Sequence, residues 1–166
     1  FMYQWISRRI EQLNLPFNSD VVEMTGTIHL VDEHIDQRQK PRVWKRTIND
    51  KTVFVAIYSK HTSNGITYMN IALPLPFSTM VGILSLEEQN GALRLASNGA
   101  AEAGVYLAIG RYTFKLPLEE YFIIQEKGDT LIATHDMTIF GLHFLHIDYT
   151  IKSRHNFDTD KEYQDV

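Results

Sequence analysis

Residues 119–152 constrain the fold most, because three runs of apolar, β-branched and aromatic residues follow one another closely there. A Lys-Gly-Asp segment at 127–129 separates the first run from the second, and Gly141 separates the second from the third. Glycine beside polar residues between such runs is typical of tight turns, and short turns join antiparallel strands. The stretch therefore predicts a three-stranded meander, and much of the chain before it repeats the pattern.

Alternation of apolar and polar residues predicts the strands that precede this meander. In residues 21–30 every second residue is apolar or glycine, which predicts a strand with one apolar face. Asn-Gly pairs at 64–65 and 90–91 mark two hairpin turns. Further strands are expected over 42–48, 52–60, 66–73, 80–87, 92–96 and 105–115, with a charged loop over 32–41. The total is about nine or ten strands.

A single helix is expected, over residues 2–13, where apolar residues recur at spacings of three and four. Sheets with this many strands must curl to bury an apolar face. We therefore predict a mainly β fold: a strongly curved antiparallel meander sheet, a barrel or half-barrel, with the N-terminal helix packed on it or plugging it. Residues 1–154 would form this one domain, and residues 155–166 a frayed acidic tail.

Composition excludes several classes of protein. The 166 residues include no cysteine, which removes disulfides, thiol catalysis and cysteine-ligated metal sites. A net charge of −4 argues against a nucleic-acid partner. No apolar run approaches the ~20 residues that cross a bilayer, and the first residues lack the regions of a signal peptide. We expect a cytoplasmic domain, and the Phe-Met start suggests a tag remnant or a domain cut from a longer polypeptide.

Sequence motifs for catalysis are missing, including the nucleophile elbow, the phosphate-binding loop and the dinucleotide fingerprint. His143 and His146 are three apart, a spacing that points two strand residues to opposite sides, so we expect neither a metal site nor a cofactor. An acid–base enzyme would instead use His135 or His146 as its base, oriented by Asp136 or Asp148. His135 shares a face with apolar residues such as Ala133 and Met137, so we expect an inward histidine with its hydrogen bonds satisfied.

Large apolar groups lie on both faces of the strands after Val105, for example Leu142 and Phe144 on one side and Leu145 and Ile147 on the other. Either the helix and loops cover the second face, or the sheet curves around a cavity. Curved sheets of about eight strands can hold one small apolar ligand.

Two arginines on otherwise apolar strands, Arg46 and Arg94, indicate what such a cavity would hold. A guanidinium directed into a curved sheet is costly unless an anion pairs with it. The anion is either an internal carboxylate or the head group of a ligand. If Arg94 proves exposed to solvent, the lipid-binding hypothesis argued from it fails, and a protein-interaction domain becomes the better interpretation. The candidate ligand-binding residues are Trp44, Arg46, Arg94, His135, His146 and Tyr149.

Four short motifs link this chain to a known family: Val-Trp-Lys-Arg at 43–46 followed by Phe54, Asn-Gly-Ala-Leu-Arg-Leu at 90–95, Gly-Val-Tyr-Leu at 104–107, and Phe-Gly at 140–141 with Tyr149. Over residues 23–152 the chain resembles an uncharacterised bacterial domain that occurs alone or at the C-terminus of multi-spanning membrane proteins of the YndJ type. It departs from the family after residues 104–105, where Tyr106 stands in place of an expected proline. The resemblance implies no established activity, but it implies a soluble domain whose parent is tethered to a membrane.

Three functions therefore stay open. The one we favour is a non-enzymatic binding module for an apolar or lipid-like small molecule, acting at the cytoplasmic face of a membrane and without a nucleic-acid partner. The alternatives are an acid–base enzyme with a His/Asp pair in the cavity of the barrel, and a protein-interaction domain with a filled core. The sequence does not determine the oligomeric state.

Overall fold

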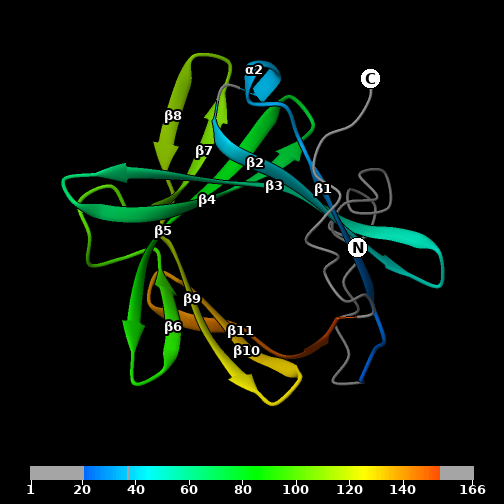
Figure 1. Ribbon diagram of the computed structural model, residues 1–166. Coiled ribbons are helices and arrows are strands. Elements are labelled where there is room, and N and C mark those ends of the chain that lie inside the picture. Colours follow the sequence, from blue (N-terminus) through cyan, green and yellow to red (C-terminus); the bar gives the residue numbers. More distant parts are fainter. Residues whose placement is uncertain (1–20, 37, 154–166) are drawn as a thin grey trace.

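The computed structural model describes residues 21–36 and 38–153 (Figure 1). The helix expected over residues 2–13 and the tail expected over 155–166 lie outside the described residues. Within them the chain is mainly β, and a single antiparallel sheet contains every strand. The predicted fold class, a curved antiparallel half-barrel, is confirmed for this part of the chain.

Eleven strands and one short helix, α2, make up the described part. Their bounds are β1 Thr25–Leu30, α2 Glu33–Asp36, β2 Gln39–Ile48, β3 Lys51–Ser63, β4 Ile66–Leu75, β5 Ser78–Gln89, β6 Ala92–Ala96, β7 Gly104–Ile109, β8 Tyr112–Lys115, β9 Leu118–Lys127, β10 Thr130–Ile139 and β11 Leu142–Lys152. The charged loop expected over 32–41 thus contains the single turn of α2 and the start of β2.

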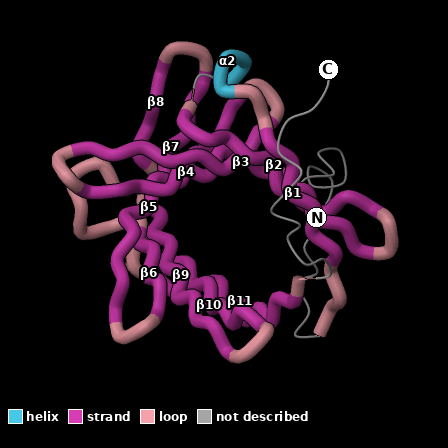
Figure 2. The backbone as a smooth tube through the Cα atoms, in the orientation of Figure 1, coloured by secondary structure: helices cyan, strands magenta, loops and turns pink. Residues whose placement is uncertain are grey.

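Nine of the strands follow one continuous path, β1-β2-β3-β4-β5-β6-β9-β10-β11. The backbone trace shows this path curving into an open ring, with β1 and β2 at one end and β10 and β11 at the other (Figure 2). Within the described ranges no ladder joins β1 to β11, so the sheet is a half-barrel and not a closed barrel. Its concave side is the face that positions the candidate site.

Tight turns set the register of the hairpins. Asn64 and Gly65 both have positive φ values, 51° and 78°, and so do Asn90 and Gly91, 54° and 74°. Two consecutive positive φ values define the turn whose twist matches antiparallel strands, and asparagine and glycine adopt them most easily. The two hairpins predicted from the Asn-Gly pairs are therefore confirmed as β3–β4 and β5–β6.

The sheet branches at β5, which the sequence did not predict. The C-terminal half of β5 pairs with β6, whereas its N-terminal half pairs with β7, from Thr79 opposite Ala108 to Ile83 opposite Gly104. The run expected as one strand over 105–115 is in fact two, β7 and β8, because a turn at Gly110 folds the second back on the first. The β7–β8 hairpin thus leaves the main path.

The best-packed core lies around β4, β5, β6 and β7. Leu84 and Val105 are completely buried, and Tyr68 and Leu95 are each 1% exposed. By contrast, all six residues of β1 are exposed, including Ile28 at 60%. The apolar face expected over residues 21–30 is therefore not part of the core formed by the described residues, and its strand begins only at Thr25.

Apolar side chains on the other end of the sheet also differ from expectation. The second face of β11 was expected to be covered or to line a cavity. Instead Leu142 is 72% exposed and Phe144 is 53% exposed, while Leu145 and Ile147 are half-buried on the concave side. Phe144 on the convex face of β11 therefore faces outward, and Leu142, which pairs with Ile139 at the end of the hairpin, is exposed as well.

Candidate functional site

Arg46 lies on the concave face, between aromatic rings of β2, β3 and β11. Its guanidinium carbon is 4.1 Å from the ring centroid of Trp44, its neighbour on β2, and 5.0 Å from that of Phe54, which pairs with it on β3. It is also 5.7 Å from the ring centroid of Tyr149 on β11. Because β2 and β11 stand near opposite ends of the strand path, this last contact spans the half-barrel.

Trp44 keeps its position because β1 has a glycine beneath it. Gly26 pairs with Arg46 across the β1–β2 ladder. A Cβ atom built on Gly26 would lie 2.5 Å from the indole Nε1 of Trp44, which is closer than real contacts allow. The indole therefore packs directly on the backbone of β1, and any side chain at this position would displace it.

The guanidinium of Arg46 has no carboxylate partner among the described residues. The ion pairs there involve Arg94 and three histidines instead. Its Nε atom is buried and has no hydrogen-bond acceptor. The aromatic rings around it offer cation–π attraction, which is weaker than an ion pair in a desolvated site. Arg46 is thus a half-buried positive charge without an anionic partner among the described residues.

His135 on β10 extends the same face. It pairs with Phe122 of β9 in the ladder, and the two rings stack with centroids 3.9 Å apart and planes 14° apart. Burial, and to a smaller extent the positive charge of Arg46, lower the pKa of His135 to about 4. The ring is neutral at pH 7, and its Nε2 atom is buried without a hydrogen-bond partner in the described structure. The inward orientation expected of His135 is confirmed, but the expectation of a satisfied histidine is wrong.

Glu120 is a second group on this face whose pKa is strongly shifted, and it was not among the site residues predicted from the sequence. The residue is only 8% exposed, and burial raises the pKa of its carboxyl to about 7. Its backbone N–H donates to the Ser97 hydroxyl at 2.7 Å, and its carbonyl accepts from the Ser97 N–H at 3.0 Å. Gly82 leaves room for the carboxyl, since a Cβ there would lie 3.2 Å from Glu120 Oε2.

Tyr58 on β3 joins these groups. Burial raises the pKa of its hydroxyl, although the nearby Arg46 guanidinium acts in the opposite direction, and the charges of Tyr149 and Glu120 are near enough to raise it as well. The only sequence feature that could have indicated Glu120 and Tyr58 is alternation, which puts Glu120 on the face of Phe122 and Glu119 on the other face. Their burial depends on strands far away in the chain.

Arg94 and His146 were expected in the same site, and the structure puts both on the convex face. Arg94 is 36% exposed in its side chain and donates a hydrogen bond to Glu87 on the adjacent β5, 3.1 Å away. The expectation that Arg94 points into the curved sheet is therefore wrong, and lipid binding through Arg94 fails with it. The register explains why: Arg94 is one residue out of step with Leu95, which pairs with Phe122 on the concave side.

His146 is half-exposed and contacts two carboxylates. Its Nδ1 lies 2.6 Å from Asp136 Oδ1, and its Nε2 lies 3.4 Å from Asp148 Oδ2. The hydrogen bond to Asp136 is the main cause that raises the pKa of His146. A His/Asp pair therefore exists, but on the outer surface and not in a cavity. His135 does not form the other expected pair, since Asp136 bonds to rings on the opposite face.

The expectation that His143 and His146 face apart is also wrong. His143 Nε2 lies 2.9 Å from the same Asp136 Oδ1 that His146 contacts. The cause is a β-bulge in the β10–β11 ladder between Met137 and Thr138, which shifts the register by one. A bulge changes the side to which the following residues point, so the two rings share one face.

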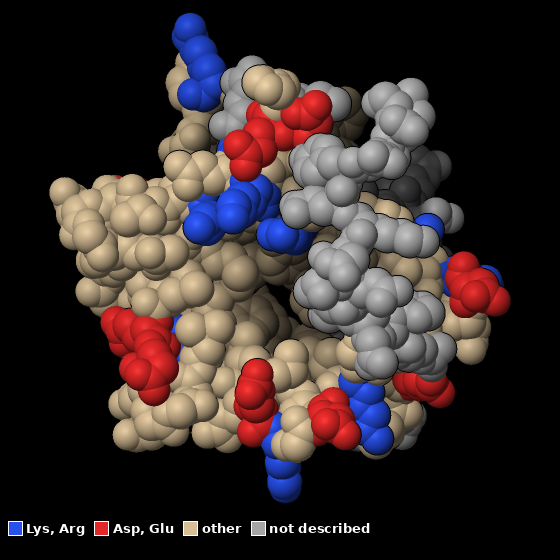
Figure 3. All heavy atoms as spheres, in the orientation of Figure 1, with Lys and Arg blue, Asp and Glu red and all other residues tan. Residues whose placement is uncertain are grey.

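The space-filling picture looks into the open end of the half-barrel (Figure 3). The surface is hollowed near its centre, basic side chains gather along one edge of the hollow, and acidic side chains lie farther out (Figure 3).

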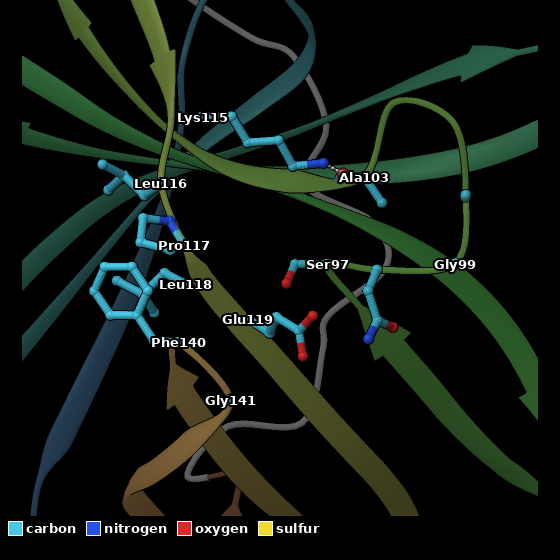
Figure 4. Close-up of a pocket in the computed structure, with 12 residues that line it drawn as sticks. Ser97, Gly99, Ala103, Lys115, Leu116, Pro117, Leu118, Glu119, Phe140 and Gly141 are labelled. Atoms are coloured by element: carbon cyan, nitrogen blue, oxygen red, sulfur yellow. Dashed lines mark hydrogen bonds between the residues drawn. The ribbon is translucent and has the colours of Figure 1, made fainter.

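A separate open pocket of about 350 Å³ lies at the rim, between the loop after β6 and the β8–β9 connection. In the close-up, Ser97 and Glu119 extend toward its middle, and Lys115 extends toward the carbonyl of Ala103, to which it donates a hydrogen bond of 2.9 Å (Figure 4). Phe140 and Pro117 form its apolar wall. None of the six predicted site residues lines this pocket.

Comparison with known proteins agrees with the resemblance seen in the sequence motifs. The chain is 43% identical over 157 residues to a bacterial protein described as uncharacterized membrane protein YndJ, from Bacillus subtilis (strain 168). The alignment covers 90% of this chain and 29% of that protein, so the chain spans less than a third of the length of the curated relative it matches. No family model matches the chain. No solved structure matches it either.

The relative is a membrane protein by its description, which fits the expected proximity to a membrane. In the part of this chain that the structure describes, no helix has the length and apolar character needed to span a bilayer.

Proposed function

We propose that this chain is a binding domain for an anionic amphiphile, a molecule with an acidic head group and an apolar tail, such as a fatty acid. The head group would lie against Arg46 on the concave face, with Trp44 and Tyr149 beside it. The observation that carries the proposal is Arg46 itself: a half-buried guanidinium, surrounded by three aromatic rings, with no carboxylate partner among the described residues.

The groups around Arg46 do not cancel its charge. His135 is neutral at pH 7 because burial holds its pKa near 4. Burial keeps a large part of the Glu120 carboxyl protonated at the same pH, since its pKa is about 7. An anion that enters this face gains the attraction of Arg46 in a partly desolvated setting, and partial protonation of Glu120 reduces the opposing negative charge. The surrounding rings supply the apolar surface that a lipid tail requires.

Fluorescence titration with a dansyl-labelled fatty acid tests the proposal. Its fluorescence should rise saturably with protein concentration, and an uncharged ester of the same probe should bind more weakly. Arg46→Met keeps much of the apolar stem and removes the charge, so it should weaken binding by at least about 2 kcal/mol, roughly thirtyfold. Arg94→Met is the matched control, and it should bind the probe as the unmodified protein does.

Equal binding by the protein with Arg46 and by Arg46→Met would contradict the head-group assignment. A complete lack of saturable binding would contradict the amphiphile proposal itself. Because Arg94 pairs with Glu87 on the convex face, the proposal depends on Arg46 alone, and this experiment is decisive for it.

A protein-interaction domain is the second candidate, and the exposed tip of the β10–β11 hairpin favours it. Phe140 is 78% exposed and Leu142 is 72% exposed, with Ile139 and Phe144 next to them. Contiguous apolar surface of this kind commonly marks a docking site. Sedimentation of the protein and of a Phe140→Ser, Leu142→Ser variant tests self-association first: a dimer that dissociates in the variant supports this candidate, and two identical monomers refute self-association through the tip.

We further propose that the domain acts at the cytoplasmic face of a membrane, as a part or a companion of a protein like its membrane-bound relative. Support comes from the similarity to YndJ, of which this chain matches 29%. Fusion of reporter proteins to the matching part of YndJ in Bacillus subtilis tests the side: green fluorescent protein should fluoresce there, and alkaline phosphatase should be inactive. The reverse pattern would place the domain outside the cell.

A further inference from the structure

We propose that Asp136, His143 and His146 form a binding site for a divalent transition-metal ion such as Zn²⁺, on the convex face of the β10–β11 hairpin. This site is separate from the concave face that holds Arg46. The three-residue spacing of His143 and His146 alone argued against such a site. The β-bulge in the β10–β11 ladder brings the two rings to one face.

The geometry brings three ligand atoms together. His143 Nε2 is 2.9 Å and His146 Nδ1 is 2.6 Å from Asp136 Oδ1. Suitable nitrogen and oxygen atoms of the three residues all lie within 4.8 Å of one another. Zinc–nitrogen and zinc–oxygen bonds of about 2.0–2.2 Å put neighbouring ligands about 3.3 Å apart, so small side-chain rotations suffice to surround an ion.

The fold explains why these residues converge. Asp136 pairs with His146 directly across the β10–β11 ladder. Without a bulge His143 would point to the concave side, because three positions along a strand change the face. The register shift between Met137 and Thr138 reverses this and directs the His143 ring to the same face. Bulges often re-aim a side chain beside a functional site.

A second carboxylate supports the assignment independently. The two ring nitrogens of His146 face different partners: Nδ1 faces Asp136, and Nε2 lies 3.4 Å from Asp148 Oδ2. A histidine that binds a metal through one nitrogen commonly donates the N–H of the other to a carboxylate, which fixes the tautomer and the orientation of the ring. Asp148 is placed for this outer role.

The donor set selects the kind of ion. Two imidazoles and one carboxylate suit Zn²⁺, Ni²⁺ and Cu²⁺, whereas Mg²⁺ and Ca²⁺ prefer a shell of oxygen ligands. The residues are exposed, with side-chain exposures of 55% for His143 and 50% for His146, so water can complete the coordination and the ion can exchange. Metal binding would join β10 to β11 next to the exposed hairpin tip.

Calorimetric titration of the untagged chain with zinc chloride tests the site. We expect one saturable zinc site, no comparable heat with magnesium chloride, and a rise of a few degrees in the unfolding temperature when zinc is in excess. Cobalt should give the strong visible absorption of a low-symmetry site. His143→Gln and His146→Gln should each weaken zinc binding at least tenfold, and Asp148→Asn should weaken it less.

His29→Gln is the control, because His29 is an exposed histidine on β1 and is not part of the cluster. It should bind zinc as the unmodified chain does. Exposed glutamine is tolerated on strands, so we expect every variant to keep its fold. Circular dichroism would check this. Zinc binding that survives in the His143→Gln, His146→Gln double variant would overturn the proposal, as would the absence of a saturable zinc site or an equal loss in His29→Gln.

Discussion

Two buried titratable groups on the concave face should make opposite contributions to stability as pH changes. Burial raises the pKa of Glu120 from about 4.5 in the unfolded chain to about 7. The folded state then binds more protons than the unfolded state between these values, so its stability falls as pH rises through that window. Burial lowers the pKa of His135 from about 6.5 to about 4. There the unfolded state binds more protons, so stability rises as pH rises from about 4 to 6.5.

The two magnitudes are similar. Each group has a pKa that differs by about 2.5 between the folded and unfolded states. A pKa difference of one corresponds to about 1.4 kcal/mol, so either group contributes about 3 kcal/mol to the free energy of unfolding. Glu120 is 8% exposed and His135 is half-buried, so solvent screening reduces the His135 contribution more. Because the windows overlap and the signs differ, the contributions largely cancel in the unmodified protein. Removing one group by substitution should therefore leave the pH dependence of stability that the other group causes.

Urea unfolding between pH 4 and pH 8, followed by tryptophan fluorescence, measures these contributions. The unfolding free energy of Glu120→Gln, minus that of the unmodified protein, should rise by about 3 kcal/mol as pH increases through the Glu120 window. The corresponding difference for His135→Gln should fall by up to the same amount through the His135 window. The exposed Glu126→Gln control should stay within about 0.5 kcal/mol of the unmodified protein at each pH. A pH-independent difference for either buried variant would refute the burial argument for that group.

Three further predictions concern packing, and urea unfolding at pH 7 measures all of them. Gly26→Val should destabilise the chain by about 1–3 kcal/mol, since its side chain would overlap the Trp44 indole, and an unchanged midpoint would show that the indole moves freely. Leu84→Ala should cost about 2–5 kcal/mol because Leu84 is completely buried, and a smaller loss would mean that the core collapses around it. Arg94→Ala should cost less than about 1 kcal/mol because its ion pair with Glu87 is exposed, whereas a larger loss would contradict that exposure.

Local patterns predicted the parts of the fold that depend on neighbouring residues. The Asn-Gly pairs set two hairpins, because their positive φ values are a property of the turn itself. Alternation placed Glu119 and Glu120 on opposite faces and directed His135 inward. These features need no knowledge of distant strands, and the 43% identity to YndJ agrees with the motifs that suggested the family.

Features that depend on pairing with strands elsewhere were predicted poorly. The branch at β5 results from β7 competing with β6 for one edge, and nothing in residues 105–115 alone indicates it. Arg94 was assigned to the wrong face because an arginine among apolar residues was assumed to point inward. Its pairing with Glu87 across the β5–β6 ladder satisfies the charge on the outside instead.

Both candidate sites arise where the sheet departs from regular pairing. The Arg46 cluster forms because β2 and β11 belong to opposite regions of an open path and approach across its concave side, which brings Tyr149 to Arg46. The histidine cluster forms because one bulge in β10–β11 turns His143 toward Asp136. A strictly regular meander would keep His143 and His146 on opposite faces, and a flat sheet would keep Tyr149 far from Arg46. The groups available for binding are therefore set by curvature and by one shift of register, and these properties appear only when the whole sheet is assembled.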